Sequence, residues 1–330
     1  MGHTKRPCIA CVVDEDVFSR IKAADESHSR ARYDLSVIRA LQNMFCTVKV
    51  IRAVENSSRT IDELVRVRPD VVFNLAFSIH PLEPSFVGCL EVLGVPYTGS
   101  SPCGIALAND KVRSRQLLHA AGLRVPRFVE LPVNQPISMD LEPPLIVKPS
   151  RLASSAGIHA DSVVSDQRHV ARLVRRVWKR FELSAVCEEF IIGREFRIGL
   201  VEDKHHDFRI SGISEWKFGS ALPGWGFKTE AIKLSRKVRQ ARNVSRGPAL
   251  LPKKEYAELL TICRAALKAL DVRGYATVDI RMNDLRQAYV LEVNANPGLW
   301  SGGVTWSQPS FEVNLRRIVD SALSHRVRKL

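Results

Sequence analysis

Short apolar runs alternate with amphipathic ones through the first third of the chain, and the connections between them are short. The expected strands cover 9–14, 47–53 and 70–77, and the expected helices cover 33–45, 60–67 and 84–94. Strands that alternate with helices in this way form an open, mostly parallel sheet, which is an α/β pattern. A dinucleotide-binding fold would carry a GxGxxG after the first strand, and none is present there. The pattern therefore gives an oxidoreductase only weak support.

The remainder of the chain predicts strands that follow one another more closely. The expected strands cover 143–150, 158–165, 184–192, 194–202, 207–216, 275–282 and 287–294, and the expected helices cover 109–121, 166–180, 254–270 and 309–325. Residues 219–252 carry no clear element. A stretch of this length in a compact domain is usually a functional lid or disordered.

Composition argues against several classes of protein. The longest apolar runs have only about six residues, so we expect no membrane span, no signal peptide and a cytoplasmic location. Seven scattered cysteines suit reduced thiols. The net charge is +14, and two basic runs, 172–180 and 233–246, stand out. A positive field attracts polyanions of any kind. We expect no nucleic-acid partner, because no motif interleaves basic with aromatic residues.

The segment VLEVNANPG (290–298) places polar side chains on an otherwise apolar strand. Side chains alternate faces along a strand, so Glu292 and Asn294 share a face. If the chain turns at 285–286, Asp279 of the preceding strand lies opposite Glu292. Opposed carboxylates repel unless a cation lies between them, and carboxylate and amide oxygens suit Mg²⁺. The pattern fits a magnesium site, and it fits equally a hairpin that turns its polar residues outward.

Three further segments carry residues suited to a bound nucleotide. Lys148 ends an apolar strand, and the small residues over 150–157 let backbone N–H groups approach phosphates closely. Lys111 stands near the start of the helix expected over 109–121. A cation there is unfavourable unless an anion lies nearby, although a solvent-exposed lysine is the alternative. In CEEFIIGREF (187–196) a short connection exposes backbone groups that can read an adenine edge, and Glu195 suits ribose hydroxyls.

As a set these segments resemble the ATP-grasp superfamily, and within it the D-alanine–D-alanine ligase-like branch. The matching segments cover most of 85–298 in the family's order: LEVLGVPYTGS, ALANDKVRSRQLLHAAGLRVP, PPLIVKPSRLASSAGI, EEFIIGREF and ATVDIRM…YVLEVNANPG. The resemblance implies an N-terminal α/β domain over 1–106 and two ATP-grasp subdomains. The central one covers 107–190, and the C-terminal one covers 191–330 with a lid at 219–252.

The same resemblance implies roles for individual residues. The phosphate-binding residues would be Lys111, Lys148, Ser150, Ser154, Ser155 and Gly157. Adenine would be taken by Glu188 and the backbones of Glu189 and Ile191, and ribose by Glu195. Asp279, Glu292 and Asn294 would bind two Mg²⁺ ions, with Mn²⁺ as an alternative. Lys233 aligns with a lysine on the family's mobile lid.

The activity implied by the resemblance is ATP-dependent ligation. A carboxylate attacks the γ-phosphate of ATP and becomes an acyl phosphate, which an amine converts to an amide, leaving ADP and phosphate. Phosphoryl transfer requires mainly alignment and charge neutralisation, which two metals and two lysines would supply. A lid over 219–252 would keep water from the acyl phosphate.

The chain departs from the family pattern where the substrates and the transferred phosphate would lie. Thr277 stands where the family has an arginine, and Arg281 and Arg197 are the candidates to replace it. The substrate-facing segments also differ, so we expect small-molecule amino acid or peptide substrates other than two D-alanines. The basic run 233–246 indicates an acidic substrate, or one larger than alanine. The alternative is a non-catalytic nucleotide- or polyanion-binding module, and family analogy suggests a homodimer.

Overall fold

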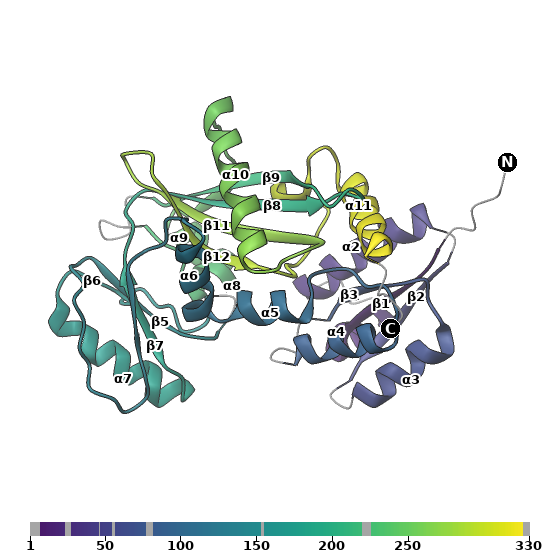
Figure 1. Ribbon diagram of the computed structural model, residues 1–330, viewed down its shortest axis with the longest axis horizontal. Helices are drawn as coiled ribbons and strands as arrows, with labels where there is room; N and C mark the ends of the chain where they lie inside the picture. Colours follow the sequence, from purple (N-terminus) through teal and green to yellow (C-terminus); the bar gives the residue numbers. More distant parts are fainter. Residues whose placement is uncertain are drawn as a thin grey trace.

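The computed structural model describes residues 7–23, 28–45, 47–54, 57–76, 82–152, 155–219 and 226–325. Its strands form three sheets, which Figure 1 shows as neighbouring regions. The N-terminal sheet lies at the right, the five-stranded sheet across the middle, and the third sheet at the lower left. One parallel sheet combined with helices and antiparallel sheets agrees with the predicted fold class. No described helix has the length and apolar character needed to cross a membrane.

The N-terminal sheet contains β1 (Cys8–Asp14), β2 (Thr47–Ala53) and β3 (Val71–Leu75), in the order β2-β1-β3. Both pairs are parallel, as predicted. The accompanying helices are α1 (Glu15–Lys22), α2 (Ser29–Met44), α3 (Ser57–Val67) and α4 (Glu83–Val92). Alternate residues of β1 belong to two different apolar clusters, because helices cover both faces of the sheet. This double burial explains the nearly continuous apolar runs in the sequence.

The central sheet contains β4 (Phe128–Leu131), β5 (Leu145–Pro149), β6 (Val163–Val164) and β7 (Ala185–Glu189), in the order β4-β7-β5-β6 with antiparallel pairs. The 3-10 turn η1 (Gln167–His169) leads into α7 (Val170–Phe181), whose apolar face packs on the sheet. β6 is shorter than the strand predicted over 158–165. The backbone turns there, with the Ser162 N–H donating to the His159 carbonyl at 3.0 Å.

The helix predicted over 109–121 is interrupted, and the structure has α5 (Pro102–Asn109) and α6 (Lys111–Ala120) instead. Asp110 between them has an extended backbone. Its carboxylate accepts hydrogen bonds from the N–H groups of Val112 and Arg113 at 3.1 and 3.0 Å. An aspartate in this position stabilises the start of a helix. Lys111 is therefore the first residue of α6.

The C-terminal sheet contains β8 (Arg194–Glu202), β9 (Phe208–Lys217), β10 (Ser245–Pro248), β11 (Tyr275–Met282) and β12 (Ala288–Asn294), in the order β10-β9-β8-β11-β12. All of its pairs are antiparallel. α10 (Lys253–Ala269) packs on one face. After β12 the chain passes through η2 (Val304–Trp306) to α11 (Phe311–Ser324), which shares a core with the N-terminal sheet.

The β11–β12 hairpin pairs Asp279 with Glu292, as predicted, but by a different route. The turn spans 284–286 instead of 285–286, and Arg286 takes a left-handed φ of 59° there. This longer turn shifts the register near the turn by one residue. A bulge at Leu291 absorbs the extra residue and restores the predicted pairing.

Residues 219–252 contain three short elements where the sequence predicts none: α8 (Glu230–Leu234), α9 (Arg236–Ala241) and β10. The hydroxyls of Thr229 and Ser235 cap the two helices, each accepting a hydrogen bond from a first-turn N–H. Ile232 anchors the segment on Trp216. Elements this short do not display a hydrophobic period. Residues 220–225 lie outside the described part of the chain, and the lid function stays a prediction.

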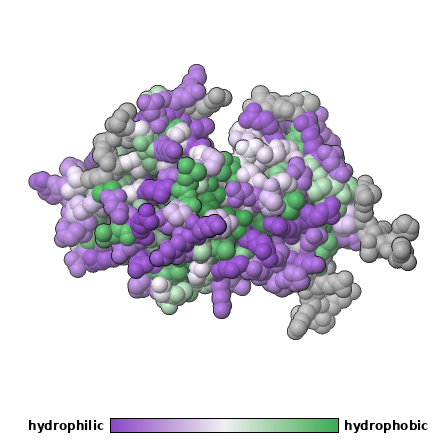
Figure 2. Space-filling model, turned by 90° about the horizontal axis from the view of Figure 1, so that it is seen from above, coloured by the Kyte–Doolittle hydropathy of each residue, from purple (hydrophilic) through white to green (hydrophobic). Residues whose placement is uncertain are grey.

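The three sheets fall within the predicted ranges 1–106, 107–190 and 191–330, whose boundaries remain a proposal. Hydrophilic residues cover most of the face seen in Figure 2, and apolar residues gather near its middle. Of the well-exposed apolar side chains, Val92 lies at the end of α4 and Leu250 lies in the loop between β10 and α10. They do not suggest a single apolar docking face.

Candidate active site

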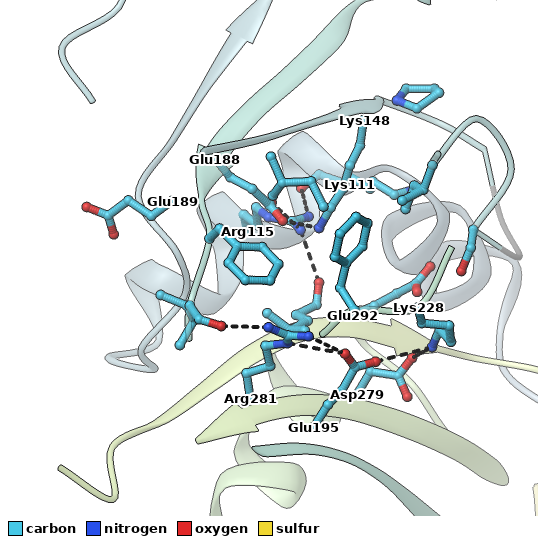
Figure 3. A pocket seen from close by; sticks show the side chains of 18 of the residues that line it. Lys111, Arg115, Lys148, Glu188, Glu189, Glu195, Lys228, Asp279, Arg281 and Glu292 are labelled. Atoms are coloured by element: carbon cyan, nitrogen blue, oxygen red, sulfur yellow. Dashed lines mark hydrogen bonds and ion pairs between the residues drawn. The ribbon is translucent and has the colours of Figure 1, made fainter. Parts of the chain in front are cut away.

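A cavity lies where the central sheet and the C-terminal sheet face each other (Figure 3). One wall comes from α6, β5, β7 and the loop after β5, and the other from β8, β11 and β12. Its charged lining residues are Lys111, Arg115, Lys148, Glu188, Glu189, Glu195, Lys228, Asp279, Arg281 and Glu292. Ser155 and Ile191 also line it. Most of the predicted nucleotide-site and metal-site residues therefore surround one space, which we call the nucleotide cavity.

Asp279 and Glu292 oppose each other at one end of this cavity. Asp279 accepts two hydrogen bonds from Arg197, both of 2.7 Å, and one from Lys228 of 3.2 Å. Burial raises the pKa of Asp279, but the two cations outweigh burial and hold that pKa well below its usual range. The Asp279 carboxylate is therefore ionised. The cations beside it offset its repulsion from the opposed Glu292 carboxylate.

Asn294 lies two residues beyond Glu292 on β12, on the same face of the strand. Its side-chain nitrogen and the hydroxyl of its cross-strand neighbour Thr277 are buried without a hydrogen-bond partner in the described part of the chain. Buried polar atoms are rarely left unpaired, so this end of the hairpin fits a bound polar group. The carboxylates of Asp279 and Glu292 and the amide oxygen of Asn294 are the hard oxygen donors that a magnesium ion takes. The donor set fits the predicted metal, although Asn294 is not among the cavity's lining residues.

Lys111 and Lys148 reach into the cavity from the opposite wall (Figure 3). The Lys148 ammonium pairs with Glu188, and the Lys111 ammonium donates to the carbonyl of Leu152. Burial lowers the pKa of both lysines, despite the opposing effect of nearby glutamates. A bound polyanion would favour their charged forms, so this wall suits phosphate groups.

The other end of the cavity is built around Arg281. Its guanidinium lies 4.5 Å from the ring centroid of Phe190, bonds Glu195 at 2.8 Å and donates to the carbonyl of Ile191 at 2.8 Å. Burial raises the pKa of Glu195, but Arg281 and Lys228 hold it below its usual range. The structure thus brings Arg281 together with Ile191 and Glu195, which are predicted adenine and ribose residues.

The two adjacent glutamates of β7 point in different directions. Glu188 is buried, and its carboxylate pairs with Lys148 and, at 2.6 Å, with Arg115. Glu189 points away from the cavity, and its carboxylate lies 3.7 Å from Arg127 (Figure 3). The adenine contact expected of the Glu188 side chain therefore competes with two cations, and it remains a proposal.

The small-residue loop after β5 is tied to α8. The Gly157 N–H donates to the Glu230 carboxylate at 3.1 Å. Gly157 has a left-handed φ of 75°, and a Cβ there would lie 2.8 Å from two neighbouring side chains, so a glycine is required. Ser155 is also left-handed, with φ 61°, and Ser150 is buried. Ser154 lies outside the described residues.

Comparison with known proteins identifies the family. A family model described as "D-ala D-ala ligase C-terminus" matches residues 117–304. The chain belongs to the D-alanine–D-alanine ligase family. A D-alanine–D-alanine ligase from Geotalea uraniireducens is 31% identical over 239 residues, which are 72% of this chain and 71% of that protein. A Sinorhizobium fredii protein named as uncharacterized is 32% identical over 236 residues, 69% of this chain and 66% of that protein.

A solved structure shows the same fold. The D-alanine–D-alanine ligase of Bacillus anthracis complexed with ATP superposes with a TM-score of 0.75, covering 98% of this chain and 99% of that one at 20% identity. The predicted ATP-grasp fold and ligase-like branch are confirmed. As a member of the D-alanine–D-alanine ligase family the protein is an enzyme, an ATP-dependent, ADP-forming ligase that makes C–N bonds. Membership also implies the use of a divalent metal.

Lys228 is a site residue of this ligase family member that the sequence did not single out. Its ammonium lies 3.2 Å from Asp279 and 3.7 Å from Glu195. Lys233 is the lysine predicted to lie on the mobile lid, and its side chain is outside the described part of the structure. The two lysines flank the segment TEAI, and no local pattern distinguishes them.

Arg115 is the second residue that the sequence did not single out. It is buried in α6 and joins the two walls of the cavity. Its guanidinium pairs with Glu188 at 2.6 Å and donates to the carbonyl of Leu291, the bulged residue of β12, at 3.1 Å. The available signal was its spacing, because Arg115 stands four residues after Lys111 on the same helical face.

Replacing Arg115 by methionine is expected to destabilise this ligase by about 2–3 kcal/mol, because the buried Glu188 keeps Lys148 as its one ion-pair partner among the described residues and the Leu291 carbonyl loses a hydrogen bond. Urea unfolding monitored by circular dichroism measures the change. The matched control is Arg113→Met in the same helix, where the side chain is 63% exposed and pairs with Asp110. That surface pair should contribute only about 0–1 kcal/mol. Equal effects of the two substitutions would contradict the bridging role of Arg115.

Proposed function

We propose that this ligase joins a carboxylate substrate to an amine substrate, both amino acids or small peptides, through an acyl phosphate. The observation that carries the proposal is a single cavity that sets Lys111 and Lys148 opposite Asp279 and Glu292. Phosphoryl transfer depends on aligning the triphosphate and neutralising its charge. One wall offers cations for the phosphates, and the other offers oxygen donors for the metal.

In the proposed reaction, a carboxylate oxygen bonds to the γ-phosphorus of ATP while the bond to the β–γ bridging oxygen breaks, and ADP leaves. The amine then attacks the acyl carbon and loses a proton, and inorganic phosphate leaves. Lys111 and Lys148 hold the phosphates, while Lys228 lies beside Asp279 where the transferred group passes. The segment containing α8 excludes water from the acyl phosphate. Asp279, Glu292 and Asn294 would hold two Mg²⁺ ions, which would supply further charge neutralisation.

We also infer that the substrates are not two D-alanines. The segment LWSGGVTWSQPS (299–310), which follows the metal-site strand, helps to line a second cavity of about 1010 Å³. Small-molecule pockets commonly measure about 300–1,000 Å³, so this cavity exceeds what two alanines need. The size of this second cavity and the altered substrate-side segments support larger substrates.

The proposal predicts that ADP release depends on both an amino acid and a divalent metal. Purified protein is incubated with ATP, Mg²⁺ and pools of D- and L-amino acids, with D-alanine alone as a separate arm. ADP release is expected only when the pool contains a substrate amino acid. Excess EDTA should abolish ADP release until Mg²⁺ or Mn²⁺ is added back. Mass spectrometry then identifies the amide. Efficient turnover of D-alanine alone would overturn the substrate inference.

Nucleotide binding without turnover in every pool would instead identify the non-catalytic module. Thr277, which stands at the family's arginine position, is the observation that favours this second candidate. A binding module would retain ATP affinity by calorimetry in the same samples that release no ADP.

A further inference from the structure

The second cavity lies directly beside the nucleotide cavity, and we call it the substrate cavity. The ion pair of Arg197 with Asp279 separates the two, since Arg197 lines the substrate cavity and Asp279 lines the nucleotide cavity. Lys228 lines both. The remaining walls come from α2, β9, α9, β10 and the segment 297–306. A molecule in this cavity can therefore reach the phosphate-transfer point at one end and the β10 wall at the other.

The lining of the substrate cavity is basic and aromatic. Its cationic side chains are those of Arg30, Arg32, Arg197, Lys228, Arg239 and Arg246. Asp34 is the one carboxylate among the described lining residues. Tyr33, Trp216, Trp300 and Trp306 supply aromatic surface, while Trp225 lies outside the described residues. The excess of cations over carboxylates favours an anionic occupant.

Several of these cations already have protein partners. Arg197 and Lys228 bond to Asp279. Arg30 bonds to Asp34 at 3.0 Å. The carboxylates of Asp279 and Asp34, at the edges of the cavity, are therefore already paired with these cations. These pairs leave the charge on the β10 wall without an acidic neighbour in contact.

Arg246 supplies the charge on that wall. Its side chain forms no hydrogen bond or ion pair with any described residue, although it is half-buried. Its guanidinium lies between two indoles, 5.4 Å from the ring centroid of Trp216 and 5.3 Å from that of Trp300. Burial, together with the nearby charge of Arg197, lowers the pKa of Arg246. Indole faces orient a cation but do not replace a counter-ion, so this site is prepared for an anion.

We propose that the carboxylate substrate carries a second anionic group, and that Arg246 binds this group while the reacting carboxylate lies near Arg197 and Lys228. This inference rests on the proposed ligase function. The substrate class is an amino acid or short peptide with an additional acidic group, either a side-chain carboxylate or a phosphate monoester. A guanidinium beside two indole rings can pair with either group through two parallel N–H bonds.

The test measures binding and turnover separately. The probes are the D- and L-forms of aspartate and glutamate, the isosteric neutral amides asparagine and glutamine, and O-phosphoserine. Binding is measured by isothermal calorimetry and by tryptophan fluorescence, because Trp216 and Trp300 line the cavity. Turnover is measured as ADP release. The variant is Arg246→Met, and the matched control is Arg242→Met, from the same segment but outside the cavity lining. Thermal melts confirm that both variants fold.

We expect an acidic probe to bind about 10- to 100-fold more tightly than its neutral amide, as a charge-assisted hydrogen bond predicts. The preference should disappear in Arg246→Met and persist in Arg242→Met. A preference for O-phosphoserine over aspartate and glutamate would identify the second anion as a phosphate, and the reverse preference would identify a carboxylate.

Three results would overturn the inference: no acidic probe binds, the amides bind as tightly as the acids, or the preference survives in Arg246→Met. Failure of the ligase function has a different signature. In that case the acidic preference and its loss in Arg246→Met would persist, but no probe would give ADP release.

Discussion

Replacing Glu292 by glutamine is expected to lower kcat for ADP formation by about 1000-fold or more, because the substitution removes one charge from the proposed metal-binding pair. Asp279 is held by Arg197 and Lys228, whereas Glu292 forms no ion pair with any described residue. Its charge is therefore available to a metal. Glutamine keeps the size of the side chain, so the fold should tolerate the change. Single-turnover ADP formation at saturating ATP measures the effect.

The matched control for Glu292→Gln is Glu130→Gln, an exposed strand position on the central sheet. This variant should retain wild-type turnover. A titration with Mg²⁺ adds a second readout, since the Glu292 variant should require more metal for whatever activity remains. If it kept more than a tenth of wild-type kcat with an unchanged Mg²⁺ requirement, the metal site would not lie at this hairpin.

The order of strands and helices could be predicted from the sequence because burial leaves a period in the residue types. β1 and β3 read as continuous apolar runs since helices cover both faces of their sheet. The pairing of Asp279 with Glu292 was also predicted correctly from the hairpin, but only because two differences between the predicted and observed hairpin cancel. The turn is one residue longer than predicted, and the bulge at Leu291 cancels the shift. A bulge leaves no period in the sequence, so only the structure locates it.

Residues whose roles depend on distant contacts could not be predicted. Lys111 and Lys148 stand in local patterns that suggest phosphate binding, and the structure places both at the nucleotide cavity. Lys228 has no such pattern, the spacing of Arg115 from Lys111 does not reveal its partners, and the basic run 233–246 does not single out Arg246. Each acquires its surroundings from elements far away in the chain, such as the indoles that flank Arg246. Sequence spacing along one element cannot report these neighbours.

The second large expected effect on kcat concerns the arginine that replaces the family arginine, since Thr277 stands at that position in this chain. Arg197 and Arg281 are the two candidates to replace it, and the structure places them differently. Arg197 holds both oxygens of Asp279 and lines the substrate cavity, whereas Arg281 bonds Glu195 at the predicted ribose end. Because Arg197 bonds the proposed metal ligand Asp279, we expect Arg197 and not Arg281 to lie near the transferred phosphate. The two arginines should therefore affect different kinetic constants.

We expect Arg197→Gln to lower kcat by about 100- to 1000-fold, the typical loss when one preorganised donor to a transition-state charge is removed. Arg281→Gln should mainly raise KM for ATP, because it loosens the site for the base and ribose and leaves the phosphate end in place. Steady-state kinetics with ATP varied at saturating amino acid separates these outcomes. Arg209→Gln on β9, where the side chain is exposed and pairs with Asp203 at 3.0 Å, serves as the control. Full activity in both Arg197→Ala and Arg281→Ala would show that neither side chain takes the place of the absent arginine, and the transferred phosphate would then depend on Lys228 and the metal alone.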